Sequence, residues 1–161
     1  MTSPALRDQT AAWDTDSGVE TLTYGECLDL LAMEQVGRLA VVVDGYPQVF
    51  CVNYRLDDFV VVFRTHIGTK LCAANHANIG FEVDHLDAAA RTGWSVLIEG
   101  MAEDITGQRP GVVTDRARQA GVESWVDGDK SRLVRVIPAR ITGRRIPAHE
   151  LAWATDSSGY L

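Results

Sequence analysis

Runs of β-branched and aromatic residues dominate the first half of the chain and predict a meander of three strands. The first run covers residues 37–43 and ends at Asp44-Gly45, a dipeptide typical of tight hairpin turns. A second run covers 48–54, and a third covers 59–65 after a turn at 56–58. Because short turns join these runs, we expect each strand to lie antiparallel to the one before it.

The second half of the chain predicts three more strands. Residues 79–85 alternate between apolar and polar positions, which is typical of a strand with one buried face. A longer strand is predicted over 94–105, with Gly100 as a bulge or bend. The last predicted strand, 133–141, contains Pro138, a residue that sheets accept at an edge or a bend.

Helices are predicted at three places. Thr23 and Glu26 have the spacing of a capping box, in which each side chain bonds to the backbone of the other residue, so a helix is expected over 24–34. A short helix is expected over 69–77. A third is expected over 110–122, with a proline near its start and a glycine near its end.

Six short strands with peripheral helices predict a mainly β fold, an antiparallel barrel that is closed or nearly closed. A doubly wound dinucleotide-binding fold fits poorly, because the sequence has no Gly-x-Gly-x-x-Gly and no helix between the first three strands. We expect one domain over 22–146, a flexible N-terminal segment over 1–21 and a C-terminal tail over 147–161.

Composition and charge narrow the function classes. The 161 residues are 46% apolar and 23% charged, as in ordinary soluble globular proteins. A formal net charge of −7 argues against nucleic acid as a partner and against the negative surface of a membrane. The N-terminal segment lacks the apolar core of a signal peptide, and no run has the length of a membrane-spanning helix. We therefore expect a cytoplasmic protein that binds neither nucleic acid nor membranes.

The cysteines and histidines form no recognisable metal-binding pattern. Cys27, Cys51 and Cys72 are too widely spaced for a Cys-x-x-Cys pair, and we expect each to be a small, buried, reduced residue. The four histidines lack the spacing of metal ligands. No metal site is predicted, while haem ligation by a single histidine stays open.

The segment 63–70, Phe-Arg-Thr-His-Ile-Gly-Thr-Lys, is the strongest candidate for a binding site. Backbone N–H groups at a helix start, two hydroxyls and two cations are the groups that surround a phosphate, and a lysine in a first helical turn is unfavourable without an anion. The alternative is a pair of solvated charges at a strand end and a helix start. The candidate phosphate-binding residues are Arg64, Thr65, Gly68, Thr69 and Lys70.

Two further segments are candidates for contact with a planar ligand. Asn53 and Tyr54 end the strand that pairs with 59–65 and offer an amide and an aromatic surface; alternatively they only complete a turn. Trp94 and Ser95 open the fifth strand and offer a stacking surface and a hydroxyl, although a tryptophan is more commonly part of a core.

Residues 37–71, which contain FRTHIGTK, and residues 81–104, which contain TGWSV, resemble the pyridoxamine 5′-phosphate oxidase-like, flavin-nucleotide-binding proteins. The resemblance covers about 22–141 and extends to the flavin and deazaflavin oxidoreductases of the same superfamily. It implies a six-stranded antiparallel split β-barrel of the FMN-binding type. It also implies a homodimer with two cofactor sites at the subunit interface.

The resemblance assigns roles to individual residues of this chain. By analogy, Arg64, Thr65, Thr69 and Lys70 would hold the cofactor phosphate. Val52, Asn53 and Tyr54 would lie along the isoalloxazine ring, and Trp94 and Ser95 would complete the site, with the partner subunit as one source of them.

One departure from the family's pattern limits the expected activity. The Arg-Leu-x-Pro signature of true pyridoxamine-phosphate oxidases is replaced here by Arg-Leu-Val-Arg at 132–135, so oxidation of vitamin B6 is not expected.

The leading hypothesis is an FMN-dependent oxidoreductase or flavin carrier with an unidentified small-molecule substrate and no assigned catalytic residue. One alternative is a reductase that uses the deazaflavin F420, whose acidic tail would need basic residues such as Arg38, Arg55 and Arg91. Another is a non-enzymatic dimeric protein that binds flavin or haem.

Overall fold

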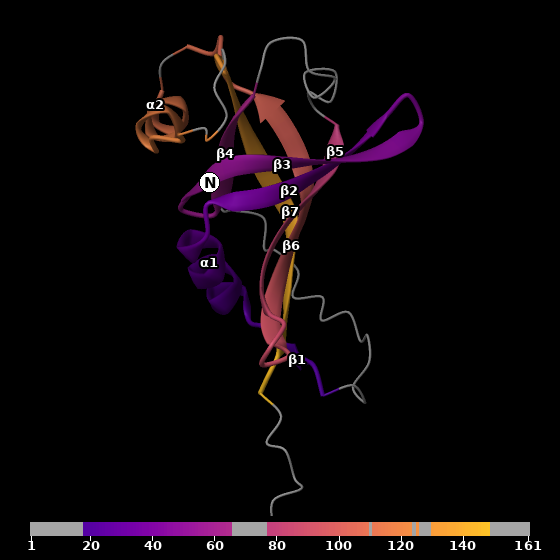
Figure 1. The fold of residues 1–161 in the computed structure, drawn as a ribbon. Coiled ribbons are helices and arrows are strands. Elements are labelled where there is room, and N and C mark those ends of the chain that lie inside the picture. The colour runs from indigo at the N-terminus through magenta and orange to yellow at the C-terminus, as the bar shows by residue number, and fades with distance from the viewer. Residues whose placement is uncertain (1–17, 66–76, 110, 124, 126–129, 149–161) are drawn as a thin grey trace, which may run out of the picture.

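The computed structural model describes residues 18–65, 77–109, 111–123, 125 and 130–148. Strands make up most of this part of the chain, and helices are few (Figure 1). In chain order the elements are β1 (Glu20–Thr21), α1 (Tyr24–Met33), β2 (Val36–Val43), β3 (Tyr46–Asp57), β4 (Val60–Thr65), β5 (Asn78–Asp87), β6 (Thr92–Asp104), α2 (Val112–Gln119) and β7 (Arg132–Ile146).

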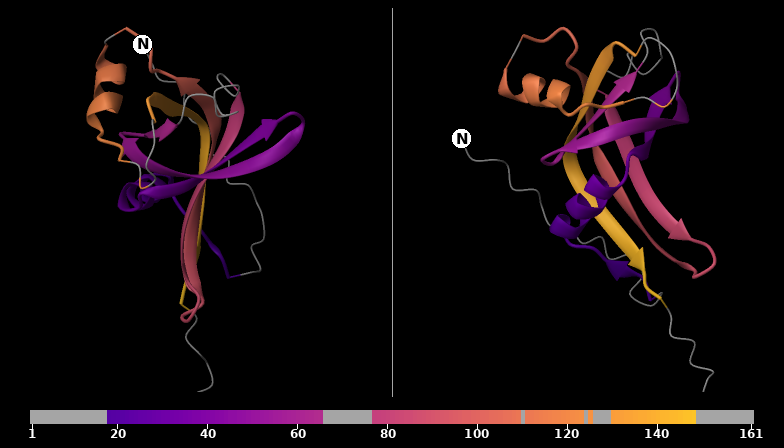
Figure 2. Two further views of the ribbon diagram at one scale, coloured as in Figure 1. Left: turned by 45° about the horizontal axis from the view of Figure 1, so that its top comes forward. Right: turned by 60° about the vertical axis from the view of Figure 1, so that its left-hand side comes forward.

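The strands form an antiparallel barrel, as the sequence predicted. Their order is β1-β7-β4-β3-β2-β5-β6, and a further pairing between β6 and β7 closes the ring. The predicted meander is confirmed as β2, β3 and β4, each antiparallel to the next. The strand count is seven within the described residues rather than six, because β1 adds a two-residue pairing to the end of β7. Figure 2 shows α2 near one end of the barrel and α1 against its side.

The strand β3 passes from one partner to another along its length. Its first part pairs with β2 as far as Asn53, and its last part pairs with β4 from Tyr54 onward. β3 is longer than the predicted 48–54, because it begins at Tyr46 and its residues after Tyr54 pair with β4. Asn53 and Tyr54 therefore lie where the two parts of the barrel meet.

The predicted hairpin turn and bulge are both present. Asp44 and Gly45 have φ angles of 52° and 81°, the two positive values that a tight turn between β2 and β3 requires. Between Glu99 and Gly100 the register of β6 against β7 shifts, and Gly100 pairs with Pro138. A Cβ atom at Gly100 would overlap the carbonyl oxygen of Ile137, which is why this position needs glycine.

The interior of the barrel is filled by one apolar cluster, and a second lies under α2. The main cluster contains Leu39, Tyr54 and Phe81, which are almost fully buried. The second cluster lies on the outer side of β4 and β7, where α2 and the chain after it cover the strands. Its members are Val62, Ile105, Ala117, Val122 and Leu133, with Val60 packed against them.

The capping box of α1 is confirmed. The backbone N–H of Thr23 donates to a carboxylate oxygen of Glu26 at 2.8 Å, and the backbone N–H of Glu26 donates to the hydroxyl of Thr23 at 3.3 Å. The bond from the Thr23 backbone lowers the pKa of the Glu26 carboxyl. The other helix in the described residues, α2, covers 112–119 of the predicted 110–122.

The predicted burial of the cysteines holds for one of them. Cys27 on α1 is buried, and its burial raises the pKa of the thiol to about 11. Cys51 is exposed, because it occupies an outward position of β3, so the prediction of a buried residue is wrong there. Cys72 and the predicted short helix over 69–77 fall outside the described residues, except for Ala77.

Candidate functional site

Arg64 and Thr65 end the strand β4, which lies between β3 and β7. Side chains alternate along a strand, so Thr65 shares the inner face with the core residue Phe63 and is buried, at 8% exposed. Arg64 points to the outer face with Val62 and is half-buried. Gly68, Thr69 and Lys70 lie outside the described residues.

Arg64 has no ion pair or hydrogen bond with any residue that the structure describes. Other arginines near this end of the barrel are neutralised: Arg132 pairs with Asp104 at 2.7 Å, and Arg135 pairs with Glu103 at 2.6 Å. No carboxylate in the described residues neutralises Arg64, and a phosphate would accept its charge-assisted hydrogen bonds. Arg64 is therefore suited to hold a phosphate.

Asn53 lies beside Arg64 on the same outer face. The pairing of Tyr54 with Phe63 places Asn53 and Arg64 one position further along the two strands. The side-chain oxygen of Asn53 accepts a hydrogen bond from the backbone N–H of Trp125 at 3.0 Å, across 72 residues of sequence. Trp125 is 72% exposed and was not predicted as a site residue; an aromatic residue in a polar loop after a helix is a weak signal in sequence alone.

Val52 and Tyr54 point inward, away from Asn53. The Tyr54 ring contacts the Phe81 ring edge-on, with centroids 5.2 Å apart, and its hydroxyl donates to the carbonyl oxygen of Leu31 at 2.5 Å. Burial raises the pKa of Tyr54, which is 1% exposed. Within this chain Tyr54 therefore anchors α1 to the barrel core, and Val52 packs against the same cluster.

Trp94 and Ser95 lie on β6, separated from Asn53 by the strands β5 and β2. Arg64 pairs with Leu133 and Ser95 pairs with Arg144, so the two residues lie far apart along β7. The Trp94 ring points inward and stacks on His85, with centroids 6.4 Å apart, whereas Ser95 points outward. One chain therefore does not bring Trp94 and Ser95 next to Arg64.

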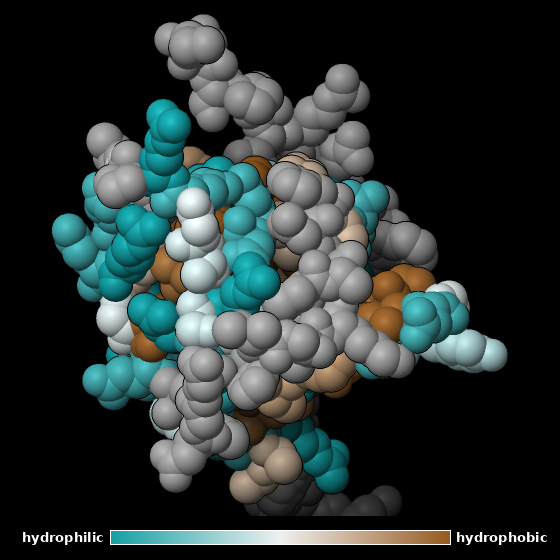
Figure 3. All heavy atoms as spheres, turned by 90° about the horizontal axis from the view of Figure 1, so that it is seen from above, coloured by the Kyte–Doolittle hydropathy of each residue, from teal (hydrophilic) through white to brown (hydrophobic). Residues whose placement is uncertain are grey.

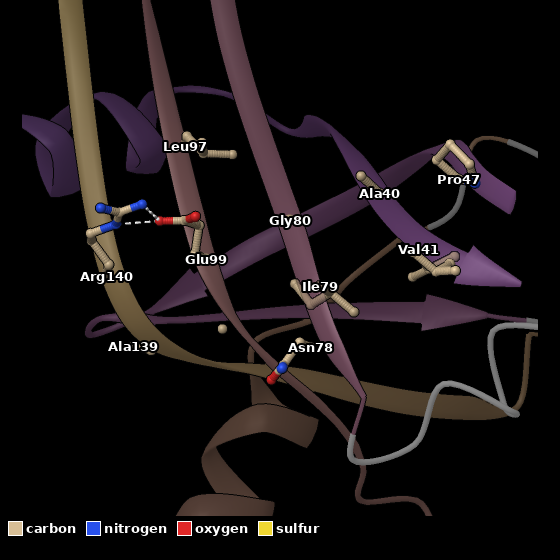
Figure 4. A pocket seen from close by; sticks show the side chains of 12 residues that line it. Ala40, Val41, Pro47, Asn78, Ile79, Gly80, Leu97, Glu99, Ala139 and Arg140 are labelled. Carbon is tan, nitrogen blue, oxygen red and sulfur yellow. Dashed lines mark hydrogen bonds and ion pairs between the residues drawn. The ribbon is translucent and has the colours of Figure 1, made fainter. Parts of the chain in front are cut away.

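A shallow groove of about 660 Å³ crosses the outer side of β2, β5, β6 and β7 (Figure 4). Leu97, Gly80 and Ala40 give it an apolar floor, and the ion pair between Arg140 and Glu99 lies at its edge. We call this surface the outer groove. Hydrophobic side chains are also exposed on the side where the β2–β3 hairpin projects (Figure 3). Val42 there is 68% exposed and Val49 is 63% exposed.

No group of three or more His, Cys, Asp or Glu side chains in 18–65, 77–109, 111–123, 125 and 130–148 could hold a metal ion. In the same ranges, neither helix is long and apolar enough to cross a membrane.

Comparison with known proteins identifies relatives over most of the chain. The sequence profile of the family described as pyridoxamine 5′-phosphate oxidase matches residues 23–145. An uncharacterized protein of Mycobacterium tuberculosis is 30% identical over 136 residues, which cover 81% of this chain and 87% of that protein.

Solved structures of two bacterial proteins share the fold. The FAD binding protein of Mycobacterium smegmatis is 37% identical, with a TM-score of 0.67, and the match covers 78% of this chain and 98% of that one. An FAD-binding protein of Mesorhizobium loti is 26% identical, with a TM-score of 0.62, covering 79% and 97%.

Proposed function

Because this chain belongs to the family of pyridoxamine 5′-phosphate oxidase-like proteins, we propose that it binds a flavin nucleotide and acts as a flavin-dependent oxidoreductase or flavin carrier. The observation that carries the proposal is Arg64, a half-buried arginine without a partner in the described part of the chain, at the strand end where the sequence predicts a phosphate-binding segment. Two solved relatives described as FAD-binding support a flavin, and FMN is the smaller ligand with the same ring and first phosphate.

The residues present fit such a ligand. The guanidinium of Arg64 can hold two phosphate oxygens at once, and the Thr65 backbone continues toward the Gly68-Thr69-Lys70 part of the predicted site. Asn53 offers its side-chain N–H groups next to Arg64 while its oxygen is held by Trp125. When bound, the flavin ring would supply the redox chemistry, accepting a hydride from a donor and passing it to an acceptor.

This chain's own residues would bind and orient the ring. The buried Tyr54 and the capped helix α1 fix the inner face of β3, which keeps Asn53 in place on the outer face. We assign no acid or base to the reaction.

We also propose that the protein is a homodimer and that a second copy covers the outer groove. Val42, Val49 and Leu97 are exposed apolar side chains around this groove, and such a patch is typical of a protein interface. The charges beside it are already neutralised within the chain, since Arg38 pairs with Glu82 at 2.9 Å and with Asp84 at 2.7 Å. We propose that Trp94 and Ser95 of the second copy complete the predicted site, because one chain does not bring them next to its own Arg64.

The proposed function is tested by equilibrium titration of the purified full-length protein with FMN, FAD, F420 and haem, followed by absorbance and fluorescence. We expect a flavin to bind with a dissociation constant of about 1 µM or lower, as expected for a cofactor site with a charge-assisted anchor. Binding of F420 alone, or a Soret band with haem and no flavin binding, would support the alternatives. Failure of both flavins would overturn the proposal.

Replacing Leu97 with glutamate is expected to convert the dimer to a monomer. The new carboxylate would lie beside Glu82 and Glu99 on the covered face, where desolvating it has a large cost. Sedimentation velocity would measure the change. Phe59→Glu is the matched control, since Phe59 is 47% exposed at the β3–β4 turn away from the groove, and it should remain dimeric. A monomeric wild-type protein would contradict the dimer.

A further inference from the structure

The ring of Trp94, a predicted site residue, lies against the ring of His85. We propose that His85 is a positioning residue: held in turn by Glu34, it fixes the Trp94 ring for contact with the flavin of the second copy. This inference rests on the proposed function and deepens it, because it makes the helix α1 of one copy responsible for part of the site in the other.

His85 and Trp94 face each other across the β5–β6 ladder. The two residues are paired in the register, so their side chains share the inner face of these strands. Their rings are nearly parallel, with an interplanar angle of 17° and centroids 6.4 Å apart. Such a pair fixes the plane of the indole ring, because rotation of the Trp94 side chain would break the contact between the rings.

Glu34 fixes the histidine. Its carboxylate lies 3.2 Å from Nδ1 of His85, and the residue itself caps the C-terminal end of α1. The last turn of α1 is tied to the barrel core by the hydrogen bond from Tyr54 to Leu31. Burial and, to a smaller degree, the charge of Glu34 raise the pKa of Tyr54, so this carboxylate lies close to the same anchor. A line of contacts therefore runs from the core through the end of α1 to Trp94.

A second carboxylate of α1 holds the other neighbour of Trp94. Arg145 on β7 pairs with Trp94 across the β6–β7 ladder and shares its face. The guanidinium of Arg145 lies 3.3 Å from the carboxylate of Glu26, in the first turn of α1, and 3.9 Å from that of Glu20. Trp94 is only half-buried between its two neighbours, so part of its ring stays available to a ligand.

The contacts of His85 contribute more to orientation than to stability. Its side chain is 64% exposed, and it lies outside the apolar cluster of the barrel. An ion pair in such a place adds little to the free energy of unfolding, because water screens it. The arrangement of Glu34, His85 and Trp94 is therefore best explained by the direction that it gives to the indole ring.

The test measures FMN binding to the full-length protein by titration, together with the fluorescence lifetime of the bound flavin, which a tryptophan ring against the isoalloxazine shortens. We expect His85→Ala to weaken FMN binding about 5-fold and to lengthen the lifetime, because the Trp94 ring loses its support. His85→Phe should stay within about 2-fold of wild type, since it keeps a flat ring at the same place. Glu34→Ala should weaken binding about 3-fold.

A double-variant cycle separates positioning from a general structural role. Trp94→Ala alone should weaken FMN binding about 10-fold, the loss expected for one stacked ring. In that background His85→Ala should cause no further loss, because its effect passes through Trp94. Asp115→Asn is the matched control: it removes an exposed ion pair on α2 and should change neither the affinity nor the lifetime.

Additive losses in the double variant would overturn the inference, and so would a wild-type affinity and lifetime in His85→Ala. If Trp94→Ala binds FMN as tightly as wild type does, Trp94 lies outside the site and the inference fails. In each of these cases a flavin still binds and the proposed function stands. If wild type binds no flavin, the proposed function itself fails.

Discussion

Replacing Arg64 with glutamine is expected to weaken flavin binding about 100-fold, the loss that follows when a bidentate, charge-assisted phosphate contact is removed from a half-buried site. The effect should be large because no carboxylate in the described residues forms an ion pair with Arg64. The whole positive charge of its side chain is therefore available to the ligand. The fold should survive, since the side chain lies on the outer face and not in the barrel core. Isothermal calorimetry with FMN and FAD would measure the change.

Two companion variants separate the geometry of the contact from its charge. Arg64→Lys keeps the positive charge but replaces the planar guanidinium, which can bind two phosphate oxygens at once, with a single ammonium group. We expect flavin affinity to fall about 10-fold. Arg91→Gln removes an exposed arginine elsewhere and should leave binding unchanged. Wild-type affinity in Arg64→Gln would show that the phosphate is held elsewhere.

Replacing Gly37 with alanine is expected to destabilise the protein by about 1–3 kcal/mol, the usual cost of overpacking a core. Gly37 on β2 pairs with Val52 and lies against the ring of Phe81, which is fully buried. A Cβ atom there would lie 2.8 Å from Cε1 of Phe81 and closer still to Cζ. Because the ring is enclosed by the barrel, it can move away only by displacing other core residues. Urea denaturation would measure the loss of free energy of unfolding.

The mechanism of this loss is tested by a second substitution at the contact. Phe81→Leu alone should also destabilise, but combined with Gly37→Ala it should cost less than the sum, because the smaller side chain leaves room for the methyl group. Gly25→Ala is the control: no atom lies within 4 Å of its Cβ position on α1, and we expect stabilisation of up to about 1 kcal/mol from helix propensity. Additive losses in the double variant would contradict the steric explanation.

The strands were predictable because apolar alternation and turn dipeptides are local signals. The capping box at Thr23 and the hairpin at Asp44-Gly45 depend on a few neighbouring residues, and both are present. The ends of strands were less predictable. Residues 56–58 were predicted as a turn, yet Leu56 and Asp57 pair with β4, a partner that local sequence does not reveal. The exposure of Cys51 has the same origin, since the outward face of a strand depends on its register.

The candidate site was predictable only in part. Arg64 stands out in sequence because a cation ends an apolar strand just before a Gly-Thr-Lys segment. Tyr54 suggests a ligand contact by its type, whereas the structure assigns it to the core through Leu31.

The irregularity between β6 and β7 has a consequence for any redesign of this barrel. Glu99 pairs with Arg140 and Gly100 with Pro138, which leaves Ala139 without an opposite residue. The inward positions of β7 are consequently even-numbered before this point, as at Val134 and Val136, and odd-numbered after it. Deleting Ala139 would remove the register shift between β6 and β7. Each later side chain of β7 would then lie on the opposite face of the strand, and basic side chains would enter the apolar interior. A single alanine thus reverses which residues of β7, even-numbered or odd-numbered, face the barrel interior.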